Sequence, residues 1–224
     1  MNVRQFRPHV VLPLILVLYV KVSVAVDSEN AAQRELDNNL RSKFVTFAKR
    51  GFEAHNKFRA RHHSPSLKWS DKLAARAQKI AYLMALNGTI QVPGVDQLGE
   101  NRAKISAVNY DCELAGEEAA KIWYNQGSHY SYSDPRLNSD TDSFTQLVWK
   151  ESRDVGMGCA QRKGTVTNEI YVVALYYPAG NSEATLRDNV IGPNKMEAKD
   201  VYATIYRRHK TKFIKKNKIH KTAQ

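Results

Sequence analysis

The 224-residue chain contains little cysteine, with only Cys112 and Cys159 present. Two cysteines form one bridge at most, which excludes a small fold held together by several disulfides. No Cys-x-x-Cys pair occurs, and no cysteine–histidine spacing is typical of a structural zinc site. Two interpretations stay open: a single disulfide formed in an oxidising compartment, or two free buried thiols.

The chain also lacks an apolar run of membrane-spanning length. The run from Val10 to Val20 has 11 residues, whereas a spanning helix needs about 20. Arg4 and Arg7 precede this run, and small residues end the segment at Ala25. A basic start, a short apolar core and a small-residue end are typical of a secretory signal. We therefore expect cleavage after about Ala25 and secretion to the extracellular space, with an uncleaved membrane anchor as the alternative.

Acidic residues are missing from both ends of the chain. The stretch 206–221 carries eight Lys and Arg residues and no acid, and Arg4, Arg7 and Lys21 add three more. Without these eleven cations, the formal charge falls from +12 to +1. The basic stretch is suited to an anionic surface, such as anionic lipid or glycosaminoglycan, but it also fits a solvated tail without a specific partner. Because export is expected, we predict no nucleic-acid partner.

Apolar residues at helical spacing predict three helices. A polar stretch at 27–41, either flexible or marginally helical, leads into a helix over 42–62. A second helix is expected over 71–87, because Ser70 is a good N-cap and Asn-Gly follows the last turn. A third is expected over 113–125. The chain therefore has the periodicity of a mainly helical framework.

Two strands and one loop complete the expected elements. Alternation at 155–160 and the β-branched and aromatic stretch 171–177 predict strands, with a hairpin around Gly164. The stretch 89–101 reads as a loop because it contains adjacent Pro and Gly. Helices on both sides of a small, mainly antiparallel sheet would form an α+β fold.

Four stretches, in this order and spacing, resemble one family. They are HNKFRARH (55–62) with LKWSDKLAARAQ just after it, LGEN (98–101), FTQLVWK (144–150) and YYPAGN (176–181). The chain resembles the CAP superfamily of cysteine-rich secretory, antigen 5 and pathogenesis-related proteins, and most of all its Golgi-associated plant pathogenesis-related subgroup. The resemblance implies a three-layer α-β-α sandwich.

The resemblance also divides the chain into segments. We assign residues 1–25 to a signal peptide, 26–41 to a polar lead-in, 42–190 to the CAP domain and 191–224 to a basic C-terminal tail.

The family cleft often holds two histidines, which can bind zinc, and two acidic residues. Carried over by motif, this tetrad falls here on Thr89, Glu100, Gln126 and Ser143. Only the glutamate is kept. One carboxylate with an amide and a hydroxyl lacks the strong donors of a usual zinc site. We therefore predict no metal and no other cofactor in this cleft.

The resemblance also bears on other single residues. The strand cysteine that would pair with Cys159 in secreted members is Ala174 here, so we expect Cys159 to be unpaired unless Cys112 approaches it. His55 is expected to be a structural hydrogen-bonding residue. Asn87 begins an Asn-Gly-Thr sequon and is a candidate for N-glycosylation, although three-residue matches also arise by chance.

The expected function is that of a secreted, non-enzymatic protein. The resemblance implies a lipid or sterol, or an extracellular protein, as ligand, and a role in defence, venom or reproduction. One alternative is a membrane- or polyanion-associated protein acting through 206–221. A second is a hydrolase with Ser143 as nucleophile, Glu100 as base and His129 in support. A serine near a helix start is more often a capping or hydrogen-bonding residue.

Overall fold

The computed structural model describes the backbone of residues 11–193 and the side chains of residues 28–193. Its elements are α1 (Val11–Arg61), β1 (Lys68–Trp69), α2 (Asp71–Asn87), β2 (Gly99–Ala107), α3 (Cys112–Asn125), η1 (Gln126–His129), α4 (Asp142–Val148), β3 (Asp154–Arg162), β4 (Asn168–Tyr177), η2 (Glu183–Thr185) and α5 (Leu186–Asn189). Within the described part of the chain, no helix is both long and apolar enough to cross a membrane.

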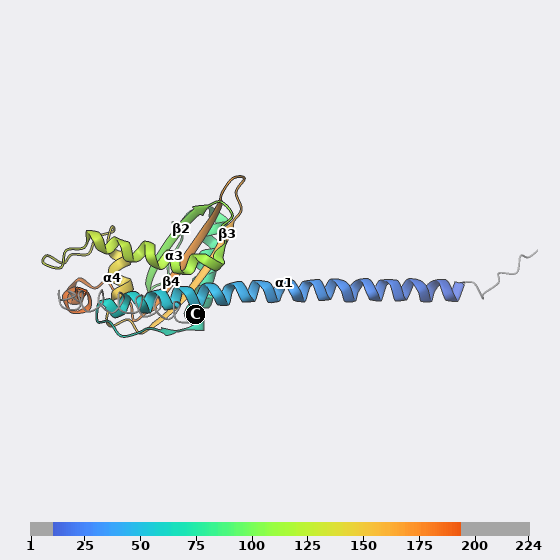
Figure 1. Cartoon of the computed structure of the whole chain (residues 1–224), viewed down its shortest axis with the longest axis horizontal. Coiled ribbons are helices and arrows are strands. Elements are labelled where there is room, and N and C mark those ends of the chain that lie inside the picture. Colours follow the sequence, from blue (N-terminus) through green and yellow to red (C-terminus); the bar gives the residue numbers. More distant parts are fainter. Residues whose placement is uncertain (1–10, 194–224) are drawn as a thin grey trace, which may run out of the picture.

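The elements form three layers, which confirms the predicted α-β-α sandwich (Figure 1). The sheet has the strand order β1-β3-β4-β2, with β1 parallel to β3 and the other two pairs antiparallel. One core cluster joins α2 to Tyr171, Val173 and Leu175 of β4. The other joins α1, α3 and α4 to the opposite face of β3 and β4. The alternation of side chains along β4 thus serves both cores.

The alternating glycines of β3 bring α2 close to the sheet. Met157 faces the α1 side and is fully buried. A Cβ on Gly156 would lie 2.1 Å from the backbone nitrogen of Ala74, and one on Gly158 would lie 2.2 Å from that of Gln78. The two glycines are therefore required for this close packing.

The second predicted helix is confirmed together with its caps. The Ser70 hydroxyl accepts a hydrogen bond from the Leu73 N–H at 3.3 Å. Gly88 ends the helix in the left-handed conformation, with φ 69°. Exposed Asn87 is the last helical residue, and its glycosylation stays a prediction.

The first helix extends beyond its predicted start. Residues 28–41, expected as a lead-in, are helical and exposed, and this part of α1 projects from the sandwich (Figure 1). Gln33 donates a hydrogen bond to Asp37 one turn later, at 2.9 Å. The basic start of the predicted signal and the basic stretch 206–221 lie outside the described residues, so cleavage and tail binding stay predictions.

The stretch 89–101 was expected to be a loop, but β2 begins within it, at Gly99. The strand lacks an apolar alternation because charged side chains occupy its second face. Lys104 on that face pairs with Glu169 of β4 at 2.6 Å. Cross-strand pairs of this kind stabilise a sheet without an apolar signal in either strand alone.

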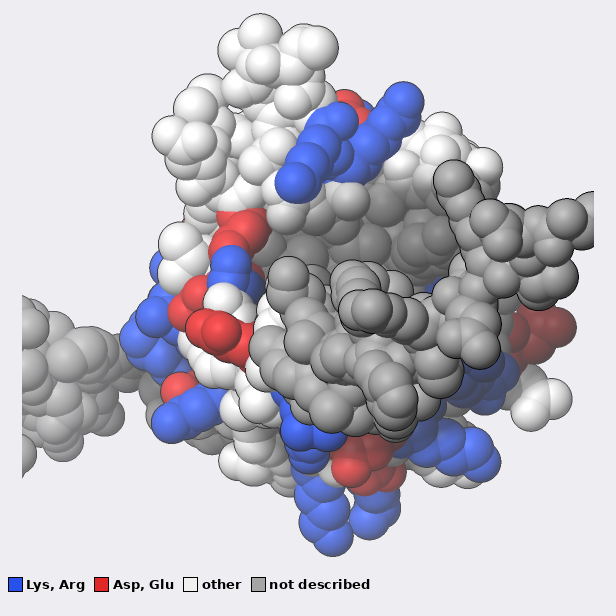
Figure 2. Space-filling model, turned by 90° about the vertical axis from the view of Figure 1, so that its right-hand side faces the viewer, with Lys and Arg blue, Asp and Glu red and all other residues white. Residues whose placement is uncertain are grey.

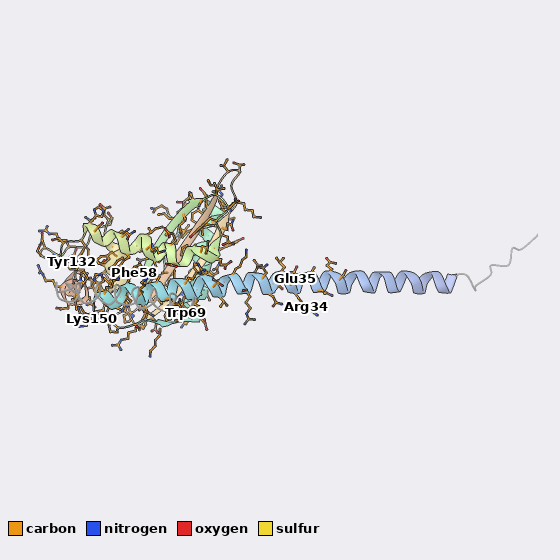
Figure 3. The ribbon with its side chains drawn as sticks, viewed as in Figure 1. Arg34, Glu35, Phe58, Trp69, Tyr132 and Lys150 are labelled. Atoms are coloured by element: carbon orange, nitrogen blue, oxygen red, sulfur yellow. A yellow bond between two sulfur atoms is a disulfide. The ribbon has the colours of Figure 1, made fainter. Side chains whose placement is uncertain are left out.

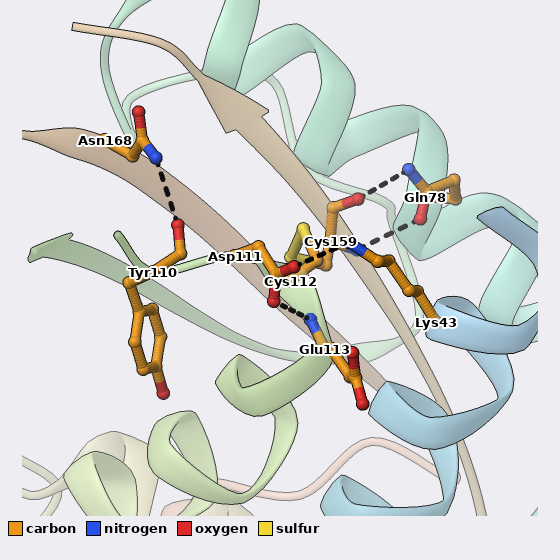
Figure 4. Close-up of a disulfide and its surroundings, with 8 residues drawn as sticks. All are labelled: Lys43, Gln78, Tyr110, Asp111, Cys112, Glu113, Cys159 and Asn168. Atoms are coloured by element: carbon orange, nitrogen blue, oxygen red, sulfur yellow. Dashed lines mark hydrogen bonds and ion pairs between the residues drawn. A yellow bond between two sulfur atoms is a disulfide. The ribbon is translucent and has the colours of Figure 1, made fainter. Parts of the chain in front are cut away.

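Cys112 and Cys159 form a disulfide, so of the two interpretations left open the single bridge is correct and the two free thiols are not (Figure 4). Cys112 is the first residue of α3, and its Cα lies 5.9 Å from that of Cys159 on β3. Next to the bridge, Lys43 of α1 pairs with Asp111 at 3.0 Å. A single bridge therefore ties α3 to the sheet where α1 enters the domain.

The face of the molecule seen along the projecting part of α1 carries charges of both signs. Figure 2 shows Lys and Arg side chains interspersed with Asp and Glu.

Candidate functional site

The four sequence motifs meet in one buried chain of hydrogen bonds. His55 Nδ1 lies 2.7 Å from the Gly51 carbonyl, so this nitrogen must carry the proton. His55 Nε2 then accepts from the Tyr176 hydroxyl at 2.8 Å. Asn101 Nδ2 donates to the Tyr176 oxygen at 3.1 Å and to the Ser143 carbonyl at 2.8 Å. Three motifs contribute one side chain each, and the FTQLVWK motif (144–150) is joined through Ser143, the residue directly before it.

His55 is a structural residue in this network, as its sequence context predicts. The side chain is fully buried, and burial lowers the pKa of His55 to about 4. The neutral imidazole is the form that can accept from Tyr176, because a protonated ring has no acceptor. The two hydrogen bonds therefore fix the neutral tautomer of His55 with the proton on Nδ1, and its Nε2 is not free to act as a base.

A second set of bonds joins the FTQLVWK and YYPAGN motifs. Thr145 donates to Asn181 Oδ1 at 2.7 Å, and Asn181 Nδ2 donates to the Asp142 carbonyl at 2.9 Å. Gln146 accepts from the Gly180 N–H at 2.8 Å. Because these bonds hold the loop after β4 against α4, the motif residues stabilise the fold.

Arg59 is a buried cation bound only by backbone carbonyls. Its guanidinium donates to the carbonyls of Pro65, Leu147, Trp149 and Ser152 at 2.8–3.0 Å. Burial lowers the pKa of Arg59 to about 10. Arg59 thereby ties α1 to the end of α4, and the sequence alone offered no signal for this role.

Two of the four tetrad positions lie together. The Ser143 N–H donates to Gln126 Oε1 at 3.1 Å, where η1 meets α4. The amide of Gln126 thus satisfies a backbone donor in the first turn of α4. Both residues are partly buried, and their contact is structural.

Glu100 is neutralised by the chain itself. Arg102 Nε lies 2.5 Å from Glu100 Oε1. The same guanidinium donates to the carbonyls of Ile90 and Val92 at 2.6 and 2.7 Å. Thr89, at the start of this loop, accepts from the Gln91 N–H. Arg102 therefore holds the loop that begins at Thr89 and neutralises Glu100, which is the one acidic residue among the four tetrad positions.

The residues at the tetrad positions do not fit a divalent metal. They include one carboxylate, and an arginine already binds it. Residues 28–193 contain no cluster of three or more His, Cys, Asp or Glu side chains that could hold a metal ion. The lack of a metal site at these positions stays a prediction.

Ser143 has no catalytic partner among the described side chains. No hydrogen bond in this part of the chain joins Ser143 to Glu100 or His129. His129 is exposed on η1, and Glu100 faces Arg102. A serine nucleophile requires a base within hydrogen-bonding reach, which this arrangement does not supply.

A groove of about 430 Å³ runs between α1 and α3. Its walls are formed by one face of each of the two helices. The lining residues are Arg50, Glu53, Ala54, Lys57, Phe58 and Arg61 of α1, and Glu117, Lys121, Tyr124 and Asn125 of α3. Phe58 and Tyr124 stack at its floor, with ring centroids 4.0 Å apart. Lys121 pairs with Glu117 at 2.8 Å.

Three cations of this groove form no ion pair with a described residue: Arg50, Lys57 and Arg61. Arg61 lies over the rings of Phe58 and Tyr124, at 5.6 and 5.8 Å from their centroids. The groove therefore combines an aromatic floor with an excess of positive charge at its rim.

A smaller hollow of about 290 Å³ shares Tyr124 and Asn125 with the groove. His62, Gly127, Ser128, Tyr132, Phe144 and Pro193 complete its lining. His62 Nδ1 bonds the Ile191 carbonyl at 2.8 Å, so Nε2 accepts from the Tyr124 hydroxyl at 3.1 Å. Burial lowers the pKa of His62. The hollow is aromatic and contains no Asp, Glu, Lys or Arg.

The sandwich and the four joined motifs are those of a CAP domain, and comparison with known proteins agrees. A family model described as "CAP: Cysteine-rich secretory protein family" matches residues 52–177. The chain therefore belongs to the cysteine-rich secretory protein (CAP) family.

Relatives and one solved structure support this assignment. The chain is 31% identical over 145 residues to the Golgi-associated plant pathogenesis-related protein 1 of Homo sapiens, covering 64% of this chain and 91% of that protein. It is 35% identical over 164 residues to the secreted protein RBT4 of Candida albicans, covering 67% of this chain but only 42% of RBT4. The crystal structure of Na-ASP-1 shares the fold, with a TM-score of 0.50 at 19% identity, covering 67% of this chain and 42% of that one.

Two of the predicted cleft positions adjoin the aromatic hollow in sequence, since Gln126 lies between its lining residues Asn125 and Gly127, and Ser143 directly precedes its Phe144. Neither Thr89, Glu100, Gln126 nor Ser143 lines the groove or the aromatic hollow. Sequence reasoning missed both, because each is formed by residues from separate motifs and loops. The helical spacing of basic and aromatic residues along 50–61 is a signal that could have indicated the groove.

Proposed function

We propose that this protein is a secreted, non-enzymatic binding protein whose α1–α3 groove holds an amphiphilic lipid with an acidic headgroup. The groove supports this proposal because an aromatic floor suits an apolar chain, and unpaired cations at the rim suit a carboxylate or phosphate. Lys57 and Arg61 are exposed, so they can reach a ligand without disturbing the core.

Secretion is supported by the apolar segment before Ala25 and by the printed names of relatives. RBT4 is named as a secreted protein. The Homo sapiens relative is named as Golgi-associated and not as secreted. A disulfide between Cys112 and Cys159 is consistent with an oxidising environment.

A non-enzymatic role is supported by the chemistry of the motif residues. Their polar groups hold one another and the backbone, and they offer no base for Ser143. Binding through the basic stretch 206–221 is compatible with the groove, because an anionic lipid surface would attract both.

The test is calorimetric titration of the delipidated, secreted protein with palmitate and with a lysophospholipid. Reversing the charge of Lys57 and Arg61 to Glu should weaken both affinities by about tenfold or more, since charge-assisted hydrogen bonds are lost and repulsion is added. Lys72→Glu with Arg76→Glu is the matched control. These two cations are also exposed and four residues apart, but lie on α2.

Wild-type protein that binds neither lipid would contradict the proposal. An equal loss of affinity in the α2 control would contradict the groove as the site, because it would show a non-specific charge effect.

A further inference from the structure

The aromatic hollow adjoins the rim of the α1–α3 groove, and this juxtaposition bears on the headgroup of the ligand. Tyr124 lines both spaces, and Arg61 lies 5.8 Å from its ring centroid. In Figure 3, Phe58 of the groove and Tyr132 of the hollow lie at the same end of the domain, away from the projecting part of α1. A ligand group held at Arg61 is therefore next to the hollow.

Four rings surround the hollow in mutually tilted orientations. His62 packs edge-on against Tyr124 and Phe144, with centroid distances of 5.6 and 5.4 Å. Tyr132 is 39% exposed and stands at the opening. Aromatic faces turned toward one space attract a cation through their negative quadrupole.

The lining of the hollow favours a quaternary ammonium over a primary ammonium group, because it contains no carboxylate. An ammonium group carries three donors that need acceptors, and the lining contains no carboxylate, only the neutral side-chain oxygens of Asn125, Ser128 and the tyrosines. The His62 acceptor is already taken by Tyr124. A quaternary ammonium has no N–H donors and presents methyl groups to the rings, so it loses no hydrogen bonds on entry.

The size of the hollow also fits a headgroup. At about 290 Å³ it lies at the lower limit of ordinary ligand pockets, and it is smaller than the neighbouring groove. Burial raises the pKa of Tyr132 to about 12, so its phenol is neutral at physiological pH.

We propose that the aromatic hollow binds the trimethylammonium group of a phosphocholine lipid, while Arg61 and Lys57 bind its phosphate and the α1–α3 groove holds its acyl chain. This inference rests on the proposed lipid-binding function for the acyl chain alone. The headgroup subsite can be tested without it, because phosphocholine is soluble.

The test compares lysophosphatidylcholine with lysophosphatidylethanolamine of the same acyl chain, titrated below micelle formation into the full secreted chain. The choline lipid should bind about tenfold more tightly, the size expected for a desolvated cation–π site. Tyr132→Leu should abolish this preference, whereas Tyr132→Phe should keep it because the ring is retained. Tyr82→Leu is the control, since Tyr82 is an exposed tyrosine on α2.

Equal affinity for the two lysolipids in the wild type would overturn the headgroup proposal and leave the groove proposal intact. So would a choline preference that survives in Tyr132→Leu. Should neither lysolipid bind, the groove proposal fails, and titration with phosphocholine against phosphoethanolamine decides the hollow alone. Binding of phosphocholine only, lost in Tyr132→Leu, supports it, and equal or absent binding overturns it.

Discussion

Arg59 and Arg61 lie two residues apart on α1 and belong to two different regions of the molecule. Arg59 is fully buried and donates to four backbone carbonyls within the network that joins the motifs. Arg61 is exposed at the α1–α3 groove and forms no ion pair with a described residue. In the interior network, side chains satisfy one another. On the groove surface, charges and rings stay open to a ligand.

This difference separates, within the HNKFRARH motif itself, the buried residues that hold the fold from the exposed residues proposed to bind. The motif residues His55, Asn101, Gln146 and Asn181 have their polar atoms bound inside the protein. Their pattern is readable in the sequence because the fold requires it. The positive charge of the groove depends on exposed residues such as Lys57 and Arg61, which do not pack in the core.

The largest expected effect comes from breaking the interior network at Arg59. Arg59→Met removes every donor while keeping an apolar side chain of similar length, so four carbonyls lose this donor, although the Trp149 carbonyl keeps the Ser152 N–H. We expect the free energy of unfolding to fall by about 4 kcal/mol, measured by urea denaturation. Arg61→Met should change it by less than about 0.5 kcal/mol. Similar losses in the two variants would contradict the division between the regions.

A second effect on the interior network should appear with pH. His55 titrates near 6.5 when unfolded and near 4 when folded, so between these values the unfolded chain binds the additional proton. Stability contributed by neutral His55 is therefore present above pH 6.5 and falls as the pH is lowered. The loss should reach about 3 kcal/mol at pH 4, at 1.36 kcal/mol for each pKa unit.

Urea denaturation at a series of pH values measures this contribution. His55→Gln should flatten the pH dependence between pH 6.5 and 4, although buried His62 still contributes in the same direction because its pKa is also lowered. The exposed His129→Gln control should keep the wild-type slope. An unchanged slope in His55→Gln would assign the acid sensitivity to other groups.

The fold could be predicted where each element carries its own signal. The helix over 71–87 has an apolar stripe, a serine N-cap and a glycine at its end, so local physics determines it. Strand β2 has no such signal, because its charged face is compensated by Arg102 with Glu100 and by Lys104 with Glu169. Strand β2 can therefore be recognised only from its contacts in the folded protein.

For the disulfide and the candidate site too, the features that depend on tertiary contacts could not be predicted from the sequence. Cys112 could not be paired from sequence, because only folding brings the start of α3 to β3. The assignment of two tetrad positions to Thr89 and Ser143 came from the resemblance and stays a prediction. The groove could not be predicted, since it exists only once Lys57 of α1 and Tyr124 of α3 lie side by side.

The central claim is that ligand binding occurs on the α1–α3 surface and not at the tetrad positions Thr89 and Glu100. Hydrogen exchange measured by mass spectrometry, with and without lysophosphatidylcholine, tests it most directly. We expect slower exchange in peptides covering 50–62 and 117–132, and unchanged exchange in the peptide covering 89–102, which contains Glu100. Protection confined to 89–102, with none along α1 and α3, would contradict the account.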